Sequence, residues 1–135
     1  MTNVDAALAL YKSINDDDLG AGAAQFADDA EWTEVPIGLT YRGPQGWHDN
    51  VNFWRDSFSE GAVEVKNVID GGAQIAVEYI GSGTNTGPVK TPEGEIPATG
   101  KRIVADFVDI WEFRDGKIVR GRSYVAGLMA QLIAP

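Results

Sequence analysis

The segment from Gly100 to Val119 constrains the fold most, because it reads as two β-strands joined by a tight turn. The turn is Arg114-Asp115-Gly116-Lys117, and Asp-Gly between strand-forming residues is typical of a β-hairpin. Side chains alternate between the two faces of a strand. One face of the first strand therefore carries Ala105, Phe107, Asp109, Trp111 and Phe113. We expect both faces to be covered, because the opposite face carries Val104, Val108 and Ile110.

Asp109 stands within an aromatic row. A carboxylate among aromatic side chains loses hydration, which disfavours the charged form and raises the pKa. In that case Asp109 is a carboxylic acid that can donate a hydrogen bond. The alternative is a hydrated Asp109 at a strand edge, or one paired with Arg120 or Arg122. The sequence leaves both interpretations open.

Composition limits the classes of function. A chain of 135 residues is long enough for one domain, residues 1–135, with its own core. The net charge of −9 disfavours nucleic acid and anionic membranes as partners. No apolar run approaches the roughly 20 residues of a membrane span, and residues 1–9 lack a signal-peptide pattern, so we expect a soluble, cytoplasmic protein. With one histidine and no cysteine, no metal site is expected.

The N-terminal residues predict a helix with Tyr11 on its buried face. Thr2 and Asp5 resemble a capping box, and apolar residues then recur at helical spacing. A buried tyrosine hydroxyl needs a partner, so Tyr11 either satisfies an interior backbone group or points its donor into a cavity. Residues 16–19 should end this helix, and a short second helix should reach Phe26.

The next two elements bring a second carboxylate close to aromatic side chains. A strand over residues 31–35 places Glu34 on the same face as Trp32; the alternative is a solvated glutamate near a strand end. A helix from Pro44 to about Phe58 should cover a sheet with an apolar stripe of Trp47, Val51, Trp54 and Phe58. His48, beside this stripe, is either a proton carrier or a boundary residue.

The rest of the chain reads mainly as strands. Residues 62–69 and 73–80 flank the turn Asp70-Gly71-Gly72, and residues 81–100 read as a flexible arm. The last strand, residues 118–125, should place small side chains inward, Ser123 among them, and Ile118 outward with the arginines. Residues 128–135 form an apolar tail, which we expect on a neighbouring subunit.

The order of elements predicts the fold class. Helix, helix, strand, helix and four antiparallel strands give an α+β fold, a cone-shaped curved antiparallel β-sheet wrapped around the N-terminal helices. Such a cone is open at one end. A concave, largely apolar cavity with a few polar groups is the expected ligand site.

Several segments resemble a known family. They are FADDAEW (26–32), GTNTGP (83–88), ATGKRI (98–103) and VDIWEFRDGKIV (108–119), and they resemble the SnoaL-like polyketide cyclases. They also resemble the wider nuclear-transport-factor-2-like (NTF2-like) superfamily, which includes ketosteroid isomerase, limonene epoxide hydrolase and scytalone dehydratase. The resemblance covers nearly the whole chain and implies an NTF2-like, cystatin-like α+β barrel. It is weaker for the reaction, because this scaffold hosts several chemistries and non-catalytic binders.

The resemblance implies roles for the polar residues. Beside the ketosteroid isomerase pattern, Glu34 is the general base, Asp109 the protonated acid of the oxyanion hole, and Tyr11 its tyrosine. The chain departs from the patterns in having glutamate at position 34 instead of aspartate, and Asn85 where many SnoaL-like sequences have histidine. Asp109 also corresponds to the strand that carries the acid-base aspartate of the SnoaL-like cyclases, and the resemblance to them implies a different role for it.

We therefore expect an enzyme that needs no cofactor and that transfers a proton or closes a ring at the carbon α to a carbonyl. Its ligand would be small and apolar and would contain a carbonyl. The expected ligand contacts are Trp32, Trp47, His48, Val51, Trp54, Phe107, Trp111 and Ser123.

Other functions remain open. An epoxide hydrolase of this superfamily uses aspartate, arginine and aspartate, which is disfavoured because Arg120 and Arg122 fall opposite the small inward face and Phe107 stands two residues before Asp109. A non-catalytic ligand-binding or dimerisation module is the third candidate. The resemblance, together with Trp111, the arm and the tail, favours a homodimer.

Overall fold

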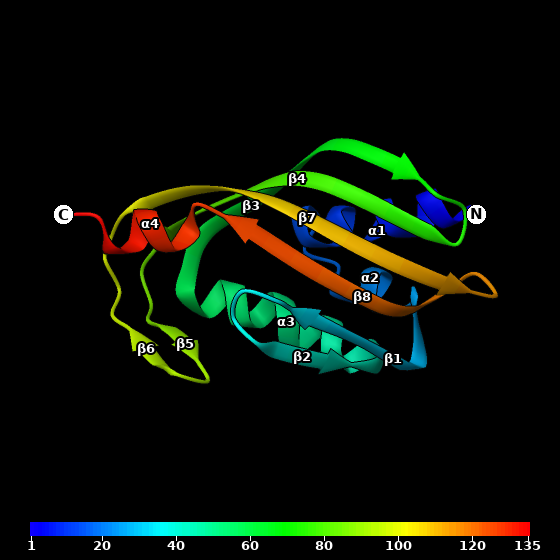
Figure 1. Cartoon of the computed structure of the whole chain (residues 1–135), viewed down its shortest axis with the longest axis horizontal. Helices are drawn as coiled ribbons and strands as arrows, with labels where there is room; N and C mark the ends of the chain where they lie inside the picture. The colour runs from blue at the N-terminus through cyan, green and yellow to red at the C-terminus, as the bar shows by residue number, and fades with distance from the viewer.

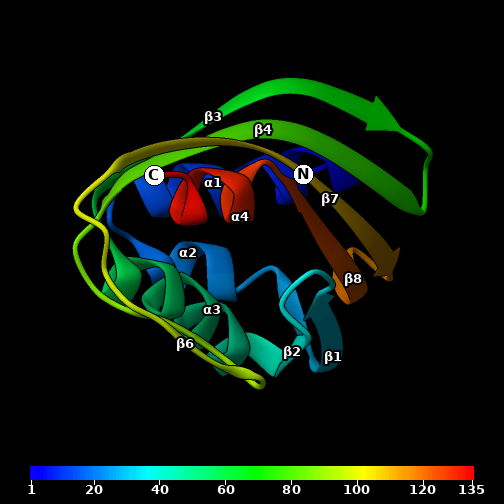
Figure 2. The ribbon, with the colours of Figure 1, turned by 60° about the vertical axis from the view of Figure 1, so that its left-hand side comes forward.

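A six-stranded sheet bends around the helices on its concave side (Figures 1 and 2). The computed structural model describes all residues, 1–135. The elements in chain order are α1 (Asn3–Asn15), α2 (Leu19–Ala23), β1 (Phe26–Glu34), β2 (Leu39–Arg42), α3 (Gly43–Ser57), β3 (Phe58–Asp70), β4 (Gln74–Asn85), β5 (Val89–Thr91), β6 (Gly94–Ile96), β7 (Arg102–Arg114), β8 (Lys117–Ala126) and α4 (Leu128–Ile133). No helix is long and apolar enough to span a lipid bilayer.

The sheet has the strand order β2-β1-β8-β7-β4-β3. Its long strands β3, β4, β7 and β8 pair antiparallel, as predicted. β1 joins β8 in parallel, and β2 pairs antiparallel with β1 at the edge. β5 and β6 form a separate hairpin. The predicted α+β fold with a curved, cone-like sheet is confirmed.

The first helix begins where the capping box predicts. The Thr2 hydroxyl accepts a hydrogen bond from the Asp5 amide at 3.1 Å, and the Asp5 carboxylate accepts one from the Thr2 amide at 2.9 Å. Both contacts satisfy amide groups that the first helical turn leaves without a partner. α1 buries Ala6, Ala7, Leu10 and Tyr11, so Tyr11 faces the core.

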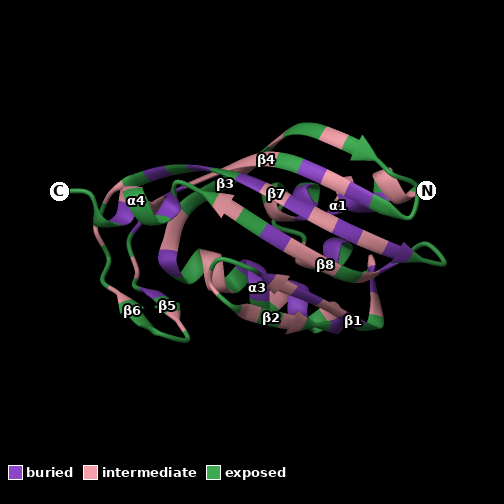
Figure 3. Cartoon of the chain, viewed as in Figure 1, coloured by how far each residue is buried: buried purple, intermediate pink, exposed green.

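Burial alternates along β7 with the predicted period (Figure 3). The inner row from Ala105 to Phe113 is buried, Asp109 included. The expectation that both faces are covered is wrong, because Val104 on the outer face is 53% exposed. The helices all lie on the concave side, so the convex face has only solvent against it within this chain.

Three other expectations also need correction. β1 begins at Phe26 rather than at residue 31, and β2 lies between β1 and α3, where the sequence predicted no strand. In the pairing of β7 with β8, Phe113 faces Ile118 and Glu112 faces Arg120, which leaves one extra residue, Val119, on β8. This β-bulge reverses the alternation, so Ile118 is buried instead of facing outward with the arginines.

The arm and the tail are more ordered than the sequence suggests. β4 continues to Asn85, and the β5–β6 hairpin occupies the middle of the predicted arm. The tail forms α4, whose Leu128 and Leu132 are buried against Phe107 and its neighbours in the same chain. The tail therefore gives no support to contact with a second subunit.

Candidate active site

A cavity of about 350 Å³ opens on the concave side of the sheet. It lies between α1, α3 and the strands β3, β4, β7 and β8, and 14 of its 25 lining residues are hydrophobic. The polar groups Glu34, Asp109 and Ser123 reach it from β1, β7 and β8. This size falls within the usual range of small-molecule sites.

Asp109 is held in a hydrogen-bond network of aromatic side chains. The Tyr11 hydroxyl donates to Asp109 Oδ2 at 2.8 Å, and the Tyr79 hydroxyl donates to Oδ1 at 3.2 Å. The Trp111 indole N–H donates in turn to the Tyr11 hydroxyl at 3.0 Å. Burial, reinforced by the charge of Glu34, raises the pKa of Asp109 to about 7, although the two tyrosines donate to it and oppose the rise.

Glu34 is the last residue of β1 and is also buried. Its Oε1 accepts hydrogen bonds from the Asn50 amide at 2.8 Å and from the Trp54 indole at 3.4 Å. Its Oε2 is enclosed and has no hydrogen-bond partner. Burial raises the pKa of Glu34, and the donors around it moderate that rise. One oxygen is thus held in place while the other stays free.

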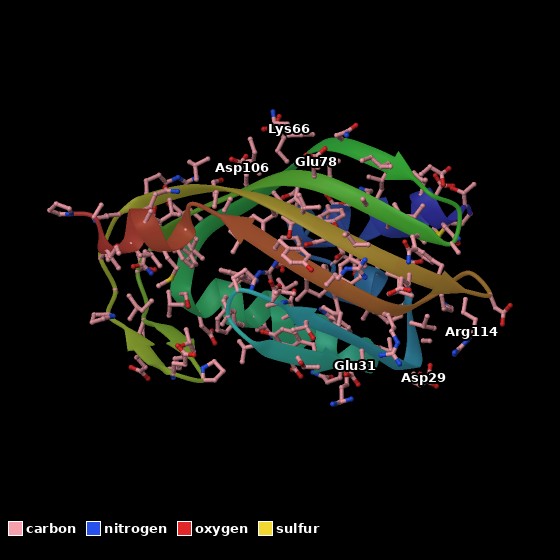
Figure 4. The ribbon with its side chains drawn as sticks, in the orientation of Figure 1. Asp29, Glu31, Lys66, Glu78, Asp106 and Arg114 are labelled. Carbon is pink, nitrogen blue, oxygen red and sulfur yellow. The ribbon has the colours of Figure 1, made fainter.

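Neither carboxyl group is neutralised by a cation. All the ion pairs of the chain involve other residues. Arg122 pairs with Glu112, and Arg55, which lines the cavity, pairs with Asp17. The labelled charges of Lys66, Glu78 and Asp106 lie outside the sheet (Figure 4). Of the two interpretations of Asp109, the structure therefore bears out the desolvated carboxyl group.

The structure brings most of the predicted site residues to this cavity. The lining includes Tyr11, Glu34, Trp47, Val51, Trp54, Phe107, Asp109, Trp111 and Ser123. Trp32 and His48 do not line it. Trp32 stacks on Phe26 with ring centroids 4.3 Å apart, as part of the core. His48 lies at a separate, more open depression beside Lys117.

Sequence reasoning missed two residues of the site. Tyr79 follows Ile75 and Val77 at period two on β4, so strand alternation alone places it on the buried face. Asn50 follows Trp47 by three positions and precedes Trp54 by four, which puts it on the same face of α3. Both signals were present in the sequence.

Two glycines make room for the aromatic walls. A Cβ on Gly121 would lie 2.4 Å from the Trp111 ring, and one on Gly81 would lie 2.7 Å from the Phe107 ring. Side-chain carbons do not approach so closely, so both rings depend on glycine across the strand pair. No group of three His, Cys, Asp or Glu side chains is assembled into a candidate metal site.

Comparison with known structures supports the fold. A candidate SnoaL-like polyketide cyclase from Jannaschia sp. CCS1 superposes with a TM-score of 0.80 at 17% identity, covering 98% of this chain and 92% of the other. An NTF2-like protein from Burkholderia thailandensis E264 gives 0.79 at 24% identity, with 100% and 99% covered. IdmH, a candidate polyketide cyclase from Streptomyces antibioticus, gives 0.76 at 22% identity, with 98% and 99% covered.

Comparison of sequences gives the family. None of the curated proteins matches the chain. The model of the SnoaL-like domain matches residues 7–121. These residues run from the first half of α1 through all elements up to β7 and end within β8. The match includes Tyr11, Glu34 and Asp109, and it covers far more than half of the chain. The protein therefore belongs to the SnoaL-like domain family.

Proposed function

We propose that this protein is an acid-base enzyme that acts on a small apolar substrate at the carbon α to a carbonyl. The observation that carries the proposal is the pair Glu34 and Asp109, two buried carboxyl groups with raised pKa values that face one cavity without a cation. Carboxyl groups whose pKa values are raised by burial are suited to proton transfer near neutral pH.

Glu34 is the proposed base. Asn50 and Trp54 hold its Oε1, so that Oε2 is left to take a proton from the substrate. The C–H bond breaks, the proton moves to Glu34 Oε2, and the electron pair of that bond moves onto the carbonyl oxygen as an enolate. The enolate then takes a proton at another carbon, which is an isomerisation, or attacks a second carbonyl, which is a cyclisation.

Asp109 in its protonated form is the proposed donor to the enolate oxygen. A donor aimed at developing negative charge in a dry site can supply about 2.7 to 4 kcal/mol of transition-state stabilisation. Tyr11 differs from the role that the isomerase resemblance implies, because its hydroxyl donates to Asp109 and accepts from Trp111. In this protein Tyr11 would position Asp109 instead of contacting the substrate.

The walls of the cavity favour a neutral, apolar ligand with a carbonyl. Trp54 and Phe107 meet edge to face at 5.6 Å, and Tyr79 stacks on Phe107 at 5.0 Å. A charged ligand would add uncompensated charge next to the carboxyl groups, or neutralise them and remove the acid-base chemistry. The structural neighbours described as candidate polyketide cyclases support the same class of ligand.

Carboxyl-carbon NMR titration tests the site without a known substrate. We expect the Asp109 carboxyl to remain protonated to about pH 7 and the Glu34 pKa to exceed that of an exposed glutamate. A phenol, as an enolate mimic, should bind and shift both resonances. Ordinary low pKa values for both groups without phenol binding would contradict the proposal.

Exchange of α-protons tests the chemistry itself. A cyclic ketone such as 2-tetralone in D₂O should exchange its α-protons faster with the protein than without it, as measured by proton NMR. Glu34→Gln should lower that acceleration by a factor of about 10² to 10⁴. Glu31→Gln is the matched control, because Glu31 lies on the same strand and pairs with Arg42 outside the cavity. Phenol binding without exchange would indicate a ligand-binding protein instead.

A further inference from the structure

The two carboxyl groups of the site share one neighbour, Ser123. In the sheet, Ser123 on β8 stands opposite Glu34 on β1 and also opposite Asp109 on β7. Adjacent strands are about 5 Å apart, so a single side chain in the middle strand can reach both neighbours. All three side chains point to the concave side and line the cavity. They form a row across three strands, in the order Glu34, Ser123, Asp109.

The row contains two buried polar atoms without a partner. These are Ser123 Oγ and Glu34 Oε2. The other oxygen atoms of the two carboxyl groups receive hydrogen bonds from outside the row, from Asn50, Trp54, Tyr11 and Tyr79. A buried polar atom without a partner costs free energy, so a native site that keeps two of them at paired positions of adjacent strands has a use for them.

The chemistry of the two atoms is complementary. A serine hydroxyl offers one donor and two lone pairs, and it rotates freely about its C–O bond. Each carboxyl group stands one strand away from Ser123 at a paired position, so rotation of the hydroxyl can turn it toward either one. With only one proton, the hydroxyl donates to one carboxylate at a time. It can accept from the other group only while that group is protonated.

We propose that the Ser123 hydroxyl is a relay that carries a proton between Asp109 and Glu34, so that the two carboxyl groups hold one proton in common. In the transfer, the O–H bond of protonated Asp109 breaks as its proton moves to Ser123 Oγ. The original hydroxyl proton of Ser123 moves at the same time to Glu34 Oε2. One proton passes from one carboxyl group to the other, and the serine ends unchanged.

The role of the relay in turnover rests on the proposed function. The transfer of a proton between the two carboxyl groups does not, because it needs no substrate. In a cyclisation, Glu34 keeps the substrate proton and Asp109 gives its proton to the new alkoxide oxygen of the product, so the site is left with the proton on Glu34. Transfer in the reverse direction, from Glu34 through Ser123 to Asp109, restores the starting state. The site is then ready for another turnover without exchange with solvent.

The relay predicts a signature in the titration of the substrate-free protein. With one shared proton, the hydroxyl accepts from the protonated carboxyl and donates to the ionised one, and this state gains two hydrogen bonds. The pair therefore loses its first proton at a lower pH, and its second at a higher pH, than it would without the hydroxyl. Ser123→Ala should narrow the gap between the two pKa values, chiefly by raising the lower one by about 1.

Carboxyl-carbon NMR of three variants and the wild type tests this. Ser123→Ala should narrow the gap, whereas Ser123→Thr, which keeps a hydroxyl on the same carbon, should restore it. Tyr124→Phe is the matched control, because it removes a hydroxyl from the exposed outer face of the same strand. An unchanged gap in Ser123→Ala, or a narrowed gap that Ser123→Thr does not restore, would overturn the relay.

Turnover separates the relay from the proposed function. In the ketone exchange assay Glu34 takes and returns the proton at one carbon and Asp109 keeps its proton, so Ser123→Ala should leave the exchange rate nearly unchanged. If the gap narrows but the protein exchanges no ketone proton, the relay stands and the proposed function fails. If exchange is present and the gap is unchanged, the function stands and the relay is wrong.

Discussion

Tyr11 Oη lies 2.8 Å from Asp109 Oδ2, although 98 positions separate the two residues in the chain. This bond joins the first helix to the strand that carries the acid. Hydrogen bonds to a carboxylate favour its ionised form, and burial opposes ionisation. Burial is the larger effect here, because the pKa of Asp109 is about 7 instead of 3.8. The tyrosine thus moderates the pKa of an acid whose environment keeps it protonated below neutrality.

The raised pKa makes stability depend on pH. The folded state holds the Asp109 proton up to about pH 7, whereas the unfolded chain releases it near pH 4, so protonation stabilises the fold below pH 4. That contribution is lost as the pH rises from 4 to 7, by up to about 4 kcal/mol for the whole shift. Asp109→Asn, which stays neutral, should therefore gain stability over the wild type as the pH rises.

Urea unfolding at several pH values measures this effect. The unfolding free energy of Asp109→Asn should increase relative to that of the wild type as the pH rises from 4 to 7. Above pH 7 the difference should stay constant. Asp106→Asn is the matched control, since Asp106 is exposed on the outer face of β7 (Figure 4). Parallel curves for Asp109→Asn and the wild type would show that Asp109 ionises normally in the folded state.

The two tyrosines should have separable effects on Asp109. Removing either donor disfavours the carboxylate, so Tyr11→Phe and Tyr79→Phe should each raise the pKa of Asp109 above about 7. Tyr11→Phe should raise it more, because its bond is the shorter. It should also cost about 1 to 3 kcal/mol of stability, since the Trp111 indole loses its acceptor.

Carboxyl-carbon titration and urea unfolding of both variants give the two readouts. Tyr124→Phe removes a tyrosine hydroxyl at the convex surface and should change neither. A lowered Asp109 pKa in either site variant would mean that the tyrosine accepts a hydrogen bond from protonated Asp109 rather than donating one.

Much of the site follows from periodicity in the sequence. Alternation along β7 places Asp109 in an aromatic row, and helical spacing places Tyr11 on the inner face of α1, because both patterns depend only on local backbone geometry. Glu34 shares its face with Trp32 for the same reason. The β-hairpin at Asp115-Gly116 lies where its turn residues predict.

Other features depend on tertiary contacts that local patterns do not encode. The bulge at Val119, which turns Ile118 inward, appears only when β8 pairs with β7. β2 is a short edge strand whose partner, β1, supplies its hydrogen bonds. His48 follows Trp47 directly on α3, yet it lies outside the cavity. Successive side chains on a helix differ in direction by about 100°.

Gly121 should be intolerant of any side chain. An added Cβ would lie 2.4 Å from the Trp111 ring and 3.1 Å from Trp32 Cβ, and both residues are fully buried. Gly121→Ala should destabilise the fold by about 1 to 3 kcal/mol, because a packed core does not absorb an extra methyl group. The Trp111 ring would have to move, which would disturb its bond to Tyr11 as well.

Gly20→Ala is the control for this prediction. The nearest atom to its added Cβ is 3.9 Å away, and the position lies in α2, where alanine is favoured over glycine by about 0.5 to 1 kcal/mol. Thermal unfolding should therefore shift in opposite directions for the two variants. Equal shifts in one direction would mean that the space around Gly121 can adjust.

The C-terminal helix α4 covers one wall of the cavity, and we expect it to detach locally while the sheet stays folded. Leu128 lines the cavity, and α4 is fixed to β7 by the Gln131 side chain, which donates to the Val104 carbonyl at 2.7 Å and accepts from its amide at 3.2 Å. β8 ends at Ala126 opposite Asp106, so Gln131 takes the place of the missing strand at Val104. The Lys101 ammonium group adds another hydrogen bond to α4 by donating to the backbone carbonyl of Gln131 at 3.1 Å.

Gln131→Ala should therefore loosen α4 without unfolding the sheet. The loss of two hydrogen bonds, each contributing about 0.5 to 1.5 kcal/mol, should speed hydrogen exchange of the Val104 amide by a factor of the order of 10. Met129→Ala, on the exposed side of α4, should leave that exchange unchanged. Faster exchange at Val104 with unaltered exchange along β4 would show that the helix opens independently of the strands behind the acid pair. Uniformly faster exchange would instead mean that α4 is an integral part of the core, because Leu132 and Phe107 would then open together with it.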